Sequence, residues 1–210
     1  MTPIDSPQIG VDRLTLTIYG TDTSADMLSA VGELYAEVYA EPPYDEGLAE
    51  VEDFESSWPQ QIDQINFRLV VARRADKPIG FAFGYQLRTQ TKWWDSTLTP
   101  IPDEITTERS GRTFAIIEVA VRRPYRQRGI GCLLHTHLIA GLSEERITLA
   151  VRPEAPAPQH AYRSWGYQPV GQIQPFPGGP VYDVMIKPLV SPVTLGSPGP
   201  PRSCTAEAVP

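Results

Sequence analysis

The chain has 210 residues, of which 41% are apolar and 20% charged, a composition typical of a globular protein with one large core. No apolar run approaches the ~20 residues of a membrane-spanning helix, and the N-terminus lacks the basic and apolar segments of a secretory signal, so we expect a cytoplasmic protein with no membrane partner. The formal net charge of −7 argues against nucleic acid as the partner and favours a neutral or cationic small molecule.

Alternating or helically spaced apolar residues define the elements of the first half of the chain. Thr23 and Ser24 are candidate caps for the first helix, and Pro42 would end it. A connection over residues 88–112 follows, and loops of this length are uncommon unless they are functional. The predicted order is strand, helix, helix, strand and strand, at residues 14–18, 25–40, 51–58, 67–73 and 79–87.

The second half of the chain begins with the most apolar stretch, residues 114–121, which only Glu118 interrupts. Such a stretch predicts a central strand that is covered on both faces. A glycine-containing turn and a helix with Ile130, Leu133 and Leu134 on one stripe come next. A strand, a helix and two strands complete the order, at residues 147–151, 158–165, 168–173 and 181–186. This order predicts an α+β fold, with helices on the faces of a mixed sheet.

The distribution of the 22 prolines indicates where regular structure cannot continue. Residues 189–210 are rich in proline and poor in large apolar side chains, so they cannot offset the entropy cost of ordering. We therefore expect an N-terminal extension over residues 1–12, one domain over 13–188 and a disordered tail over 189–210.

The turn after the central strand contains Gly129 and Gly131. Glycines let the backbone approach a ligand closely, and the start of a helix offers unpaired N–H groups and a dipole that favours anions. A phosphate or pyrophosphate is the expected ligand. A dinucleotide fingerprint would need a third glycine where this chain has Leu134, and the Gly-Lys-Ser/Thr of a P-loop is absent.

Two motifs resemble those of the GCN5-related N-acetyltransferases, or GNAT family. Arg126-x-x-Gly129-x-Gly131, directly after an apolar strand, resembles the family's pyrophosphate signature for coenzyme A. Tyr162, followed after three residues by Gly166 and an aromatic residue, resembles a second family motif. The resemblance is specific over residues 114–167 and implies a central mixed, mostly antiparallel sheet flanked by helices. Many members carry an asparagine before the last helix, where this chain has Ala155.

The resemblance also implies acetyl-CoA as co-substrate, with no metal. The two cysteines, Cys132 and Cys204, are too far apart to supply the clustered ligands of a zinc site. By resemblance, backbone N–H groups of the central strand bind pantetheine and polarise the thioester carbonyl, and the glycine turn binds the pyrophosphate. The implied cofactor-binding residues are Val119, Ala120, Val121, Arg126, Gln127, Arg128, Gly129, Ile130 and Gly131.

Two side chains are candidates for proton transfer. An amine must be neutral to attack a thioester, although an alkyl ammonium with a pKa near ~10.4 is almost wholly protonated at neutral pH. Glu118, the only ionisable residue of the central strand, is our candidate general base; its alternative role is a carboxylate at a solvated edge or paired with an arginine. Tyr162, by motif position, is the candidate acid that protonates the thiolate; its alternative role is packing alone.

Other polar and aromatic residues have weaker claims to function. His135 and His137 point in different directions on a helix and cannot form a metal pair, and His160 would face away from Tyr162. An acidic run over residues 41–55 is either a solvated helix face or a wall that attracts a cationic acceptor. The aromatic residues that either line an acceptor pocket or fill the core are Tyr44, Trp58, Trp93 and Trp94.

These features predict an N-acetyltransferase that moves an acetyl group from acetyl-CoA to a primary amine of a small molecule by direct transfer in a ternary complex. One alternative is a protein N-terminal or lysine acetyltransferase. A second is a non-catalytic coenzyme A-binding sensor or subunit, against which the presence of both Glu118 and Tyr162 argues. The sequence does not fix the oligomeric state, and a homodimer is one possible partner arrangement.

Overall fold

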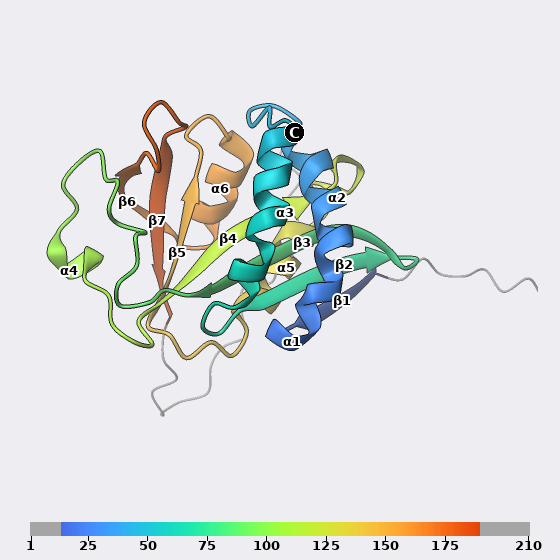
Figure 1. Cartoon of the computed structure of the whole chain (residues 1–210), viewed down its shortest axis with the longest axis horizontal. Coiled ribbons are helices and arrows are strands. Elements are labelled where there is room, and N and C mark those ends of the chain that lie inside the picture. Colours follow the sequence, from blue (N-terminus) through green and yellow to red (C-terminus); the bar gives the residue numbers. More distant parts are fainter. Residues whose placement is uncertain (1–13, 190–210) are drawn as a thin grey trace, which may run out of the picture.

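A seven-stranded sheet forms the centre of the computed structural model, which describes residues 14–189 (Figure 1). The strand order is β1-β2-β3-β4-β5-β7-β6. Only β4 and β5 pair in parallel among these strands, so the predicted mixed, mostly antiparallel sheet is confirmed. The strands are β1 Leu14–Tyr19, β2 Arg68–Arg74, β3 Lys77–Gln86, β4 Thr113–Val121, β5 Arg146–Val151, β6 Gln168–Ile173 and β7 Tyr182–Pro188.

Helices cover both faces of this sheet (Figure 1). Apolar side chains of α2 and α3 pack with β2 and β3 on one face, and those of α5 pack on the other. Within residues 14–189, no helix is long and apolar enough to cross a bilayer. The helices are α1 Thr21–Ser24, α2 Leu28–Tyr39, α3 Leu48–Ile62, α4 Asp103–Thr106, α5 Ile130–Ile139 and α6 Pro156–Ser164, with 3-10 turns η1 Ala25–Met27 and η2 Arg123–Tyr125.

The first two helices differ from their predicted bounds. Thr23 and Ser24 lie inside α1 rather than capping a long helix, since Thr23 Oγ1 accepts the N–H of Gly20 at 3.1 Å and Ser24 Oγ donates to the Gly20 carbonyl at 2.8 Å. The second helix is longer than predicted. It begins at Leu48, where Glu50 Oε2 accepts the N–H of Gly47 at 2.8 Å. It also continues through Pro59, where the burial of Trp58, 2% exposed, offsets the missing hydrogen bond.

The long connection over residues 88–112 is irregular except for α4 and a bridge between Thr97 and Ile173. Its inner side packs on β6 and β7 through Trp94 and Ile101. A buried ion pair between Glu108 and Arg146, 2.8 Å apart, ties its last part to β5. The connection is therefore fixed on the sheet, with its residues 88–96 beside the candidate site.

The expected N-terminal extension, residues 1–12, and the expected tail lie outside the described residues, except for Leu189. The N–H of Leu189 donates to the carbonyl of Glu145 at 2.8 Å.

Candidate active site

The central strands β4 and β5 separate partway along their length. Their parallel register begins at Thr113 and Arg146 and ends at Ile116 and Leu149. Beyond this point β4 pairs only with β3, and β5 only with β7. The edge of β4 from residue 117 to 121 therefore carries backbone groups that no strand pairs with on the β5 side.

A β-bulge at Ile117 decides which way Glu118 points. In the β3–β4 register Phe83 pairs with Glu118 and Gly84 with Ile116, so Ile117 is the additional residue. One additional residue reverses the facing of every side chain that follows it. Glu118 is thereby turned toward α2, where the hydroxyl of Tyr39 donates to its Oε2.

The environment of Glu118 makes its carboxyl group a weak acid. Burial raises its pKa to about 8, the negative charge of Glu46 adds to the increase, and the hydrogen bond from Tyr39 opposes it. One expected alternative, pairing with an arginine, is wrong: within residues 14–189 no cation lies in salt-bridge range of Glu118. The side chain is partly exposed and faces two hollows. A carboxyl with this pKa exchanges a proton near neutral pH.

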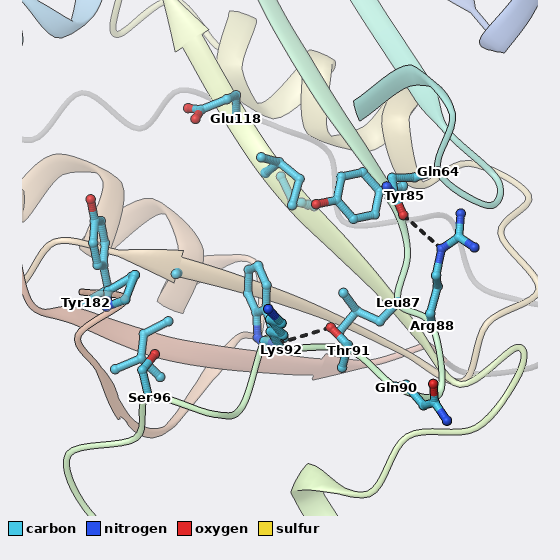
Figure 2. Close-up of a pocket in the computed structure, with 16 residues that line it drawn as sticks. Gln64, Tyr85, Leu87, Arg88, Gln90, Thr91, Lys92, Ser96, Glu118 and Tyr182 are labelled. Carbon is cyan, nitrogen blue, oxygen red and sulfur yellow. Dashed lines mark hydrogen bonds between the residues drawn. The ribbon is translucent and has the colours of Figure 1, made fainter. Parts of the chain in front are cut away.

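Glu118 also lies between two hollows. The smaller one, ≈ 100 Å³, has Tyr162 of α6 and Tyr39 of α2 in its wall together with Glu118. The larger one, ≈ 590 Å³, extends from Glu118 toward residues 88–96, as Figure 2 shows. Both hollows share the wall residues Ile117, Glu118, Ala150 and Tyr182.

Tyr162 is held in the smaller hollow by its aromatic neighbours. Its ring centroid lies 5.5 Å from that of Trp165 and 5.7 Å from that of Tyr167, both in edge-on geometry. Burial, together with Tyr44 and the charge of Glu118, raises the pKa of Tyr162 above its ordinary value. The phenol therefore keeps its proton at neutral pH and is able to donate it.

The glycine turn has the backbone that its sequence predicts. Gly129, at φ 76°, caps the N-terminus of α5, and Gln127 also has a positive φ, of 58°. Within the described chain, the N–H groups of residues 127–131 donate to no protein acceptor. These groups and the start of α5 together form an anion-binding geometry.

The predicted binding residue Arg126 has its side chain occupied. Its Nε donates to the carbonyl of Val121 at 2.8 Å, and its guanidinium lies 2.6 Å from a carboxylate oxygen of Glu41. The side chain thus joins the end of β4 to the residues that follow α2. Its backbone remains part of the turn.

Sequence reasoning missed the polar network around Glu118. Tyr39, from α2, reaches a residue 79 positions later in the chain, and no local pattern announces such a contact. Glu46 accepts a hydrogen bond from Tyr35 and lies 3.7 Å from Arg152, and burial raises its pKa. The one sequence feature that could have pointed to Glu46 is the acidic run over residues 41–55, to which it belongs.

The acidic run over residues 41–55 contributes to both roles considered for it, the wall of the site and the solvated helix face. Glu46 faces the smaller hollow, as a wall residue would. Glu41 and Glu50 are engaged with Arg126 and the backbone of Gly47, and the remaining acids lie on exposed surface, as the solvated helix face predicts. These exposed acids are Asp45, Glu52, Asp53 and Glu55.

Of the four aromatic candidates, two line a hollow and two fill the core. Trp93 lines the larger hollow and Tyr44 the smaller one. Trp58 and Trp94 are core residues, 2% and 8% exposed.

None of the three histidines lines either hollow. His135 is buried against Tyr167, with 2.9 Å between its Nε2 and the tyrosine hydroxyl, and burial lowers its pKa to about 3, so it is neutral. His137 contacts the carbonyl of Leu133 within its own helix, and His160 is exposed. Within residues 14–189, no three His, Cys, Asp or Glu side chains gather in a way that would hold a metal ion.

The chain matches a protein-family model. Residues 28–167 match the family model described as Acetyltransferase (GNAT) family. No curated protein is significantly similar to the chain in sequence.

Several solved structures with a similar fold are named as acetyltransferases. PaiA N-acetyltransferase from Thermoplasma acidophilum, in complex with coenzyme A, is 10% identical with a TM-score of 0.57, over 84% of this chain and 99% of that one. The ribosomal-protein-S18-alanine N-acetyltransferase from Escherichia coli is 17% identical with a TM-score of 0.56, over 87% and 100%. Aminoglycoside 6'-acetyltransferase type Ii is 16% identical with a TM-score of 0.55, over 83% and 96%. At these identities the likeness is one of fold.

Proposed function

The chain belongs to the GNAT acetyltransferase family, and from that premise we propose that it moves the acetyl group of acetyl-CoA to a primary amine of a small molecule, directly, in a ternary complex. As a family member it is an acyl-CoA-dependent N-acyltransferase. The observation that carries the finer proposal is Glu118, a partly buried carboxyl with a pKa of about 8 in the wall that two hollows share.

Acetyl-CoA supplies the activated acyl group as a thioester. The residues suited to hold it are those of the turn, residues 126–131, whose unpaired N–H groups at the start of α5 match a pyrophosphate. The free edge of β4 from Val119 to Val121 is suited to the pantetheine arm, and a backbone N–H there is suited to polarise the thioester carbonyl. A cofactor bound along both would end beside Glu118 and Tyr162.

Glu118 is the proposed general base. Its carboxylate takes a proton from the ammonium of the acceptor, directly or through one water, and the neutral nitrogen then bonds to the acetyl carbon. With a pKa of about 8, Glu118 is closer in pKa to an alkyl ammonium than an ordinary glutamate is. Proton transfer from the ammonium to Glu118 therefore needs less free energy. Tyr39 keeps the carboxylate oriented toward the shared wall.

Tyr162 is the proposed general acid. As the new C–N bond forms, the C–S bond breaks and its electron pair leaves on the sulfur, which takes the phenolic proton. Burial keeps that proton on Tyr162 until it is needed. The presence of Tyr162 and Glu118 around one hollow argues against a non-catalytic sensor.

The size of the larger hollow favours a small acceptor over a protein. Its ≈ 590 Å³ lies within the ~300–1,000 Å³ of small-molecule sites. Side chains from β4, β7 and residues 88–96 surround it. A lysine or an N-terminus of a folded protein would need an open groove in the same place.

Thiol release from acetyl-CoA, measured with a panel of amines, tests this proposal. We expect amine-dependent release and, by mass spectrometry, an acetylated small amine. Release that occurs only with peptides or proteins would replace the small-molecule acceptor with a protein. Coenzyme A binding with no release for any amine would support the sensor alternative.

A further inference from the structure

The larger hollow has opposite charges at its two ends. Among its lining residues in the described chain, Glu118 is the only acid, and Arg88 and Lys92 are the only cations. Figure 2 shows Glu118 and Tyr182 toward one end, Arg88 and Gln90 toward the other, and Lys92 between them. Two cations at one cavity are notable in a chain whose net charge is −7, and they attract an anion against that background.

The strand β4 separates these cations from the proposed cofactor site. The N–H of Leu87 donates to the carbonyl of Thr113 at 2.9 Å, so Arg88 follows beside the first residue of β4. Glu118 lies five residues further along, or ~17 Å at ~3.3 Å per residue, and the turn at 126–131 lies beyond the other end. Arg88 and Lys92 are therefore placed to contact the acceptor rather than the pyrophosphate.

Both cations are available to a ligand. Arg88 Nε donates to Oε1 of Gln64 at 3.2 Å, and Gln64 Nε2 donates to the carbonyl of Gln60 at 2.9 Å, which fixes the guanidinium to the end of α3 (Figure 2). In the part of the chain that the structure describes, neither Arg88 nor Lys92 forms an ion pair. The terminal nitrogens of the Arg88 guanidinium keep their donors for an anion.

The wall between the two ends is mainly apolar and aromatic. It would cover a hydrocarbon chain or a ring, which gains free energy from the area removed from water. Apart from Glu118, the two cations and the tyrosine hydroxyls, the polar side chains of the wall are Gln64, Gln90, Thr91 and Ser96. The apolar and aromatic wall residues are Tyr85, Leu87, Trp93, Ile116, Ile117, Ala150, Ile173, Pro175 and Tyr182.

We propose that the acceptor is a primary amine joined through an apolar spacer to a carboxylate or a phosphate, with its nitrogen at Glu118 and its anionic group at Arg88 and Lys92. The inference rests on the proposed function, because it assigns the hollow to the acceptor. It replaces a purely cationic acceptor, which the net charge of the chain favours, with one that carries both charges.

Acceptors of equal length and different end groups test the charge requirement. The set is hexylamine, ε-aminocaproate, aminohexyl phosphate and hexamethylenediamine, compared by kcat/KM for thiol release. We expect ε-aminocaproate or aminohexyl phosphate to exceed hexylamine by about tenfold or more, the size of one charge-assisted hydrogen bond, and hexamethylenediamine to be the poorest. The better of the two anions identifies which group the site takes.

Variants assign the preference to the two cations. In the double variant Arg88→Gln/Lys92→Gln the ratio of anionic amine to hexylamine should fall toward one, and in Lys92→Glu it should shift in favour of hexamethylenediamine. Lys77→Gln is the matched control, since Lys77 is an exposed lysine at the start of β3 that does not line the hollow. Its ratio should equal that of the unmodified protein.

Titration calorimetry with the same amines, in the presence of coenzyme A, separates this inference from the function on which it rests. Absence of thiol release with every amine would refute the proposed reaction, while tighter binding of the anionic amines, lost in the double variant, would still support the acceptor class. Equal binding and equal kcat/KM for hexylamine and the anionic amines would overturn the inference. So would an anion preference that the double variant retains.

Discussion

The two ends of β4 are built in different ways. At its C-terminal end the proposed cofactor region, residues 119–131, is made from consecutive residues: the strand edge, the turn and the start of α5. On its other side the proposed acceptor region surrounds the larger hollow with side chains from β3, β4, β5, β6, β7 and the connection at 88–112. A site made from consecutive residues leaves a pattern in the sequence, because each backbone requirement selects a residue type. A site made from distant segments leaves none.

Replacing Glu118, which lies between the two regions, should have the largest effect. Glu118→Gln keeps the side chain's size and removes the base, so kcat/KM should fall by ~10²–10⁴. In the unmodified enzyme the folded carboxyl is protonated below its pKa of about 8. The value of kcat/KM should therefore rise with pH below about 8 and level off above it, and the variant should lose this dependence. An unchanged acidic limb in Glu118→Gln would show that another group is the base.

Tyr162→Phe should have the next largest effect, and of a different kind. The variant keeps the ring that packs on Trp165 and Tyr167 and loses only the proton donor. We expect kcat to fall by about 10², since a thiolate, with a thiol pKa near 8.5, leaves with less help than a stronger base would. The affinity for acetyl-CoA should change little. Single-turnover rates equal to those of the unmodified enzyme would leave Tyr162 with a packing role only.

The bulge at Ile117 marks the limit of what the sequence predicts. Apolar periodicity predicts the existence and order of the main elements, and the glycine turn is predictable because Gly129 and Gly131 indicate a close backbone approach at the start of a helix. A period of two along β4 would have turned Glu118 toward α5, since no residue in residues 113–121 is typical of a bulge. Tyr39, the hydrogen-bond partner of Glu118, lies in α2, and no local sequence pattern indicates that its hydroxyl has a partner. Both facts follow from the pairing of β4 with β3 and the packing of α2, which are long-range contacts.

Gly129→Val tests whether the turn serves the cofactor or only the fold. The change forces a β-branched residue to a φ of 76° and places a side chain over the unpaired N–H groups. We expect the Kd for coenzyme A to rise by about tenfold or more, the loss of one charge-assisted hydrogen bond, as calorimetry would measure.

The same α5 helix supplies a matched control for this change. Gly141, just after its C-terminus, has a φ of 67°, and a Cβ at either glycine meets no atom within 4 Å. Gly141→Val should therefore lower the melting temperature by a similar amount and leave coenzyme A binding intact. Equal binding losses in the two variants would mean that strain, not the position of Gly129, weakens the cofactor site.

Tyr39→Phe should have the smallest effect; it removes a long-range contact that no sequence motif contains. The hydrogen bond from Tyr39 stabilises the carboxylate of Glu118 and so lowers a pKa that burial raises. Without that bond the pKa should rise above about 8. Hydrogen bonds to charged groups contribute ~1.5–3 kcal/mol, so the acidic limb of kcat/KM should move to higher pH by about one to two units, at 1.36 kcal/mol per unit.

The plateau of this variant at high pH should stay near that of the unmodified enzyme, because the base itself is retained. Tyr35→Phe is the control: Tyr35 packs 4.6 Å from Tyr39, centroid to centroid, but donates to Glu46 rather than to Glu118. Its acidic limb should therefore move less. If both variants moved the limb equally, the shift would come from repacking of α2. If neither moved it, the pH dependence would belong to a group other than Glu118, and the link between α2 and the reaction would be structural alone.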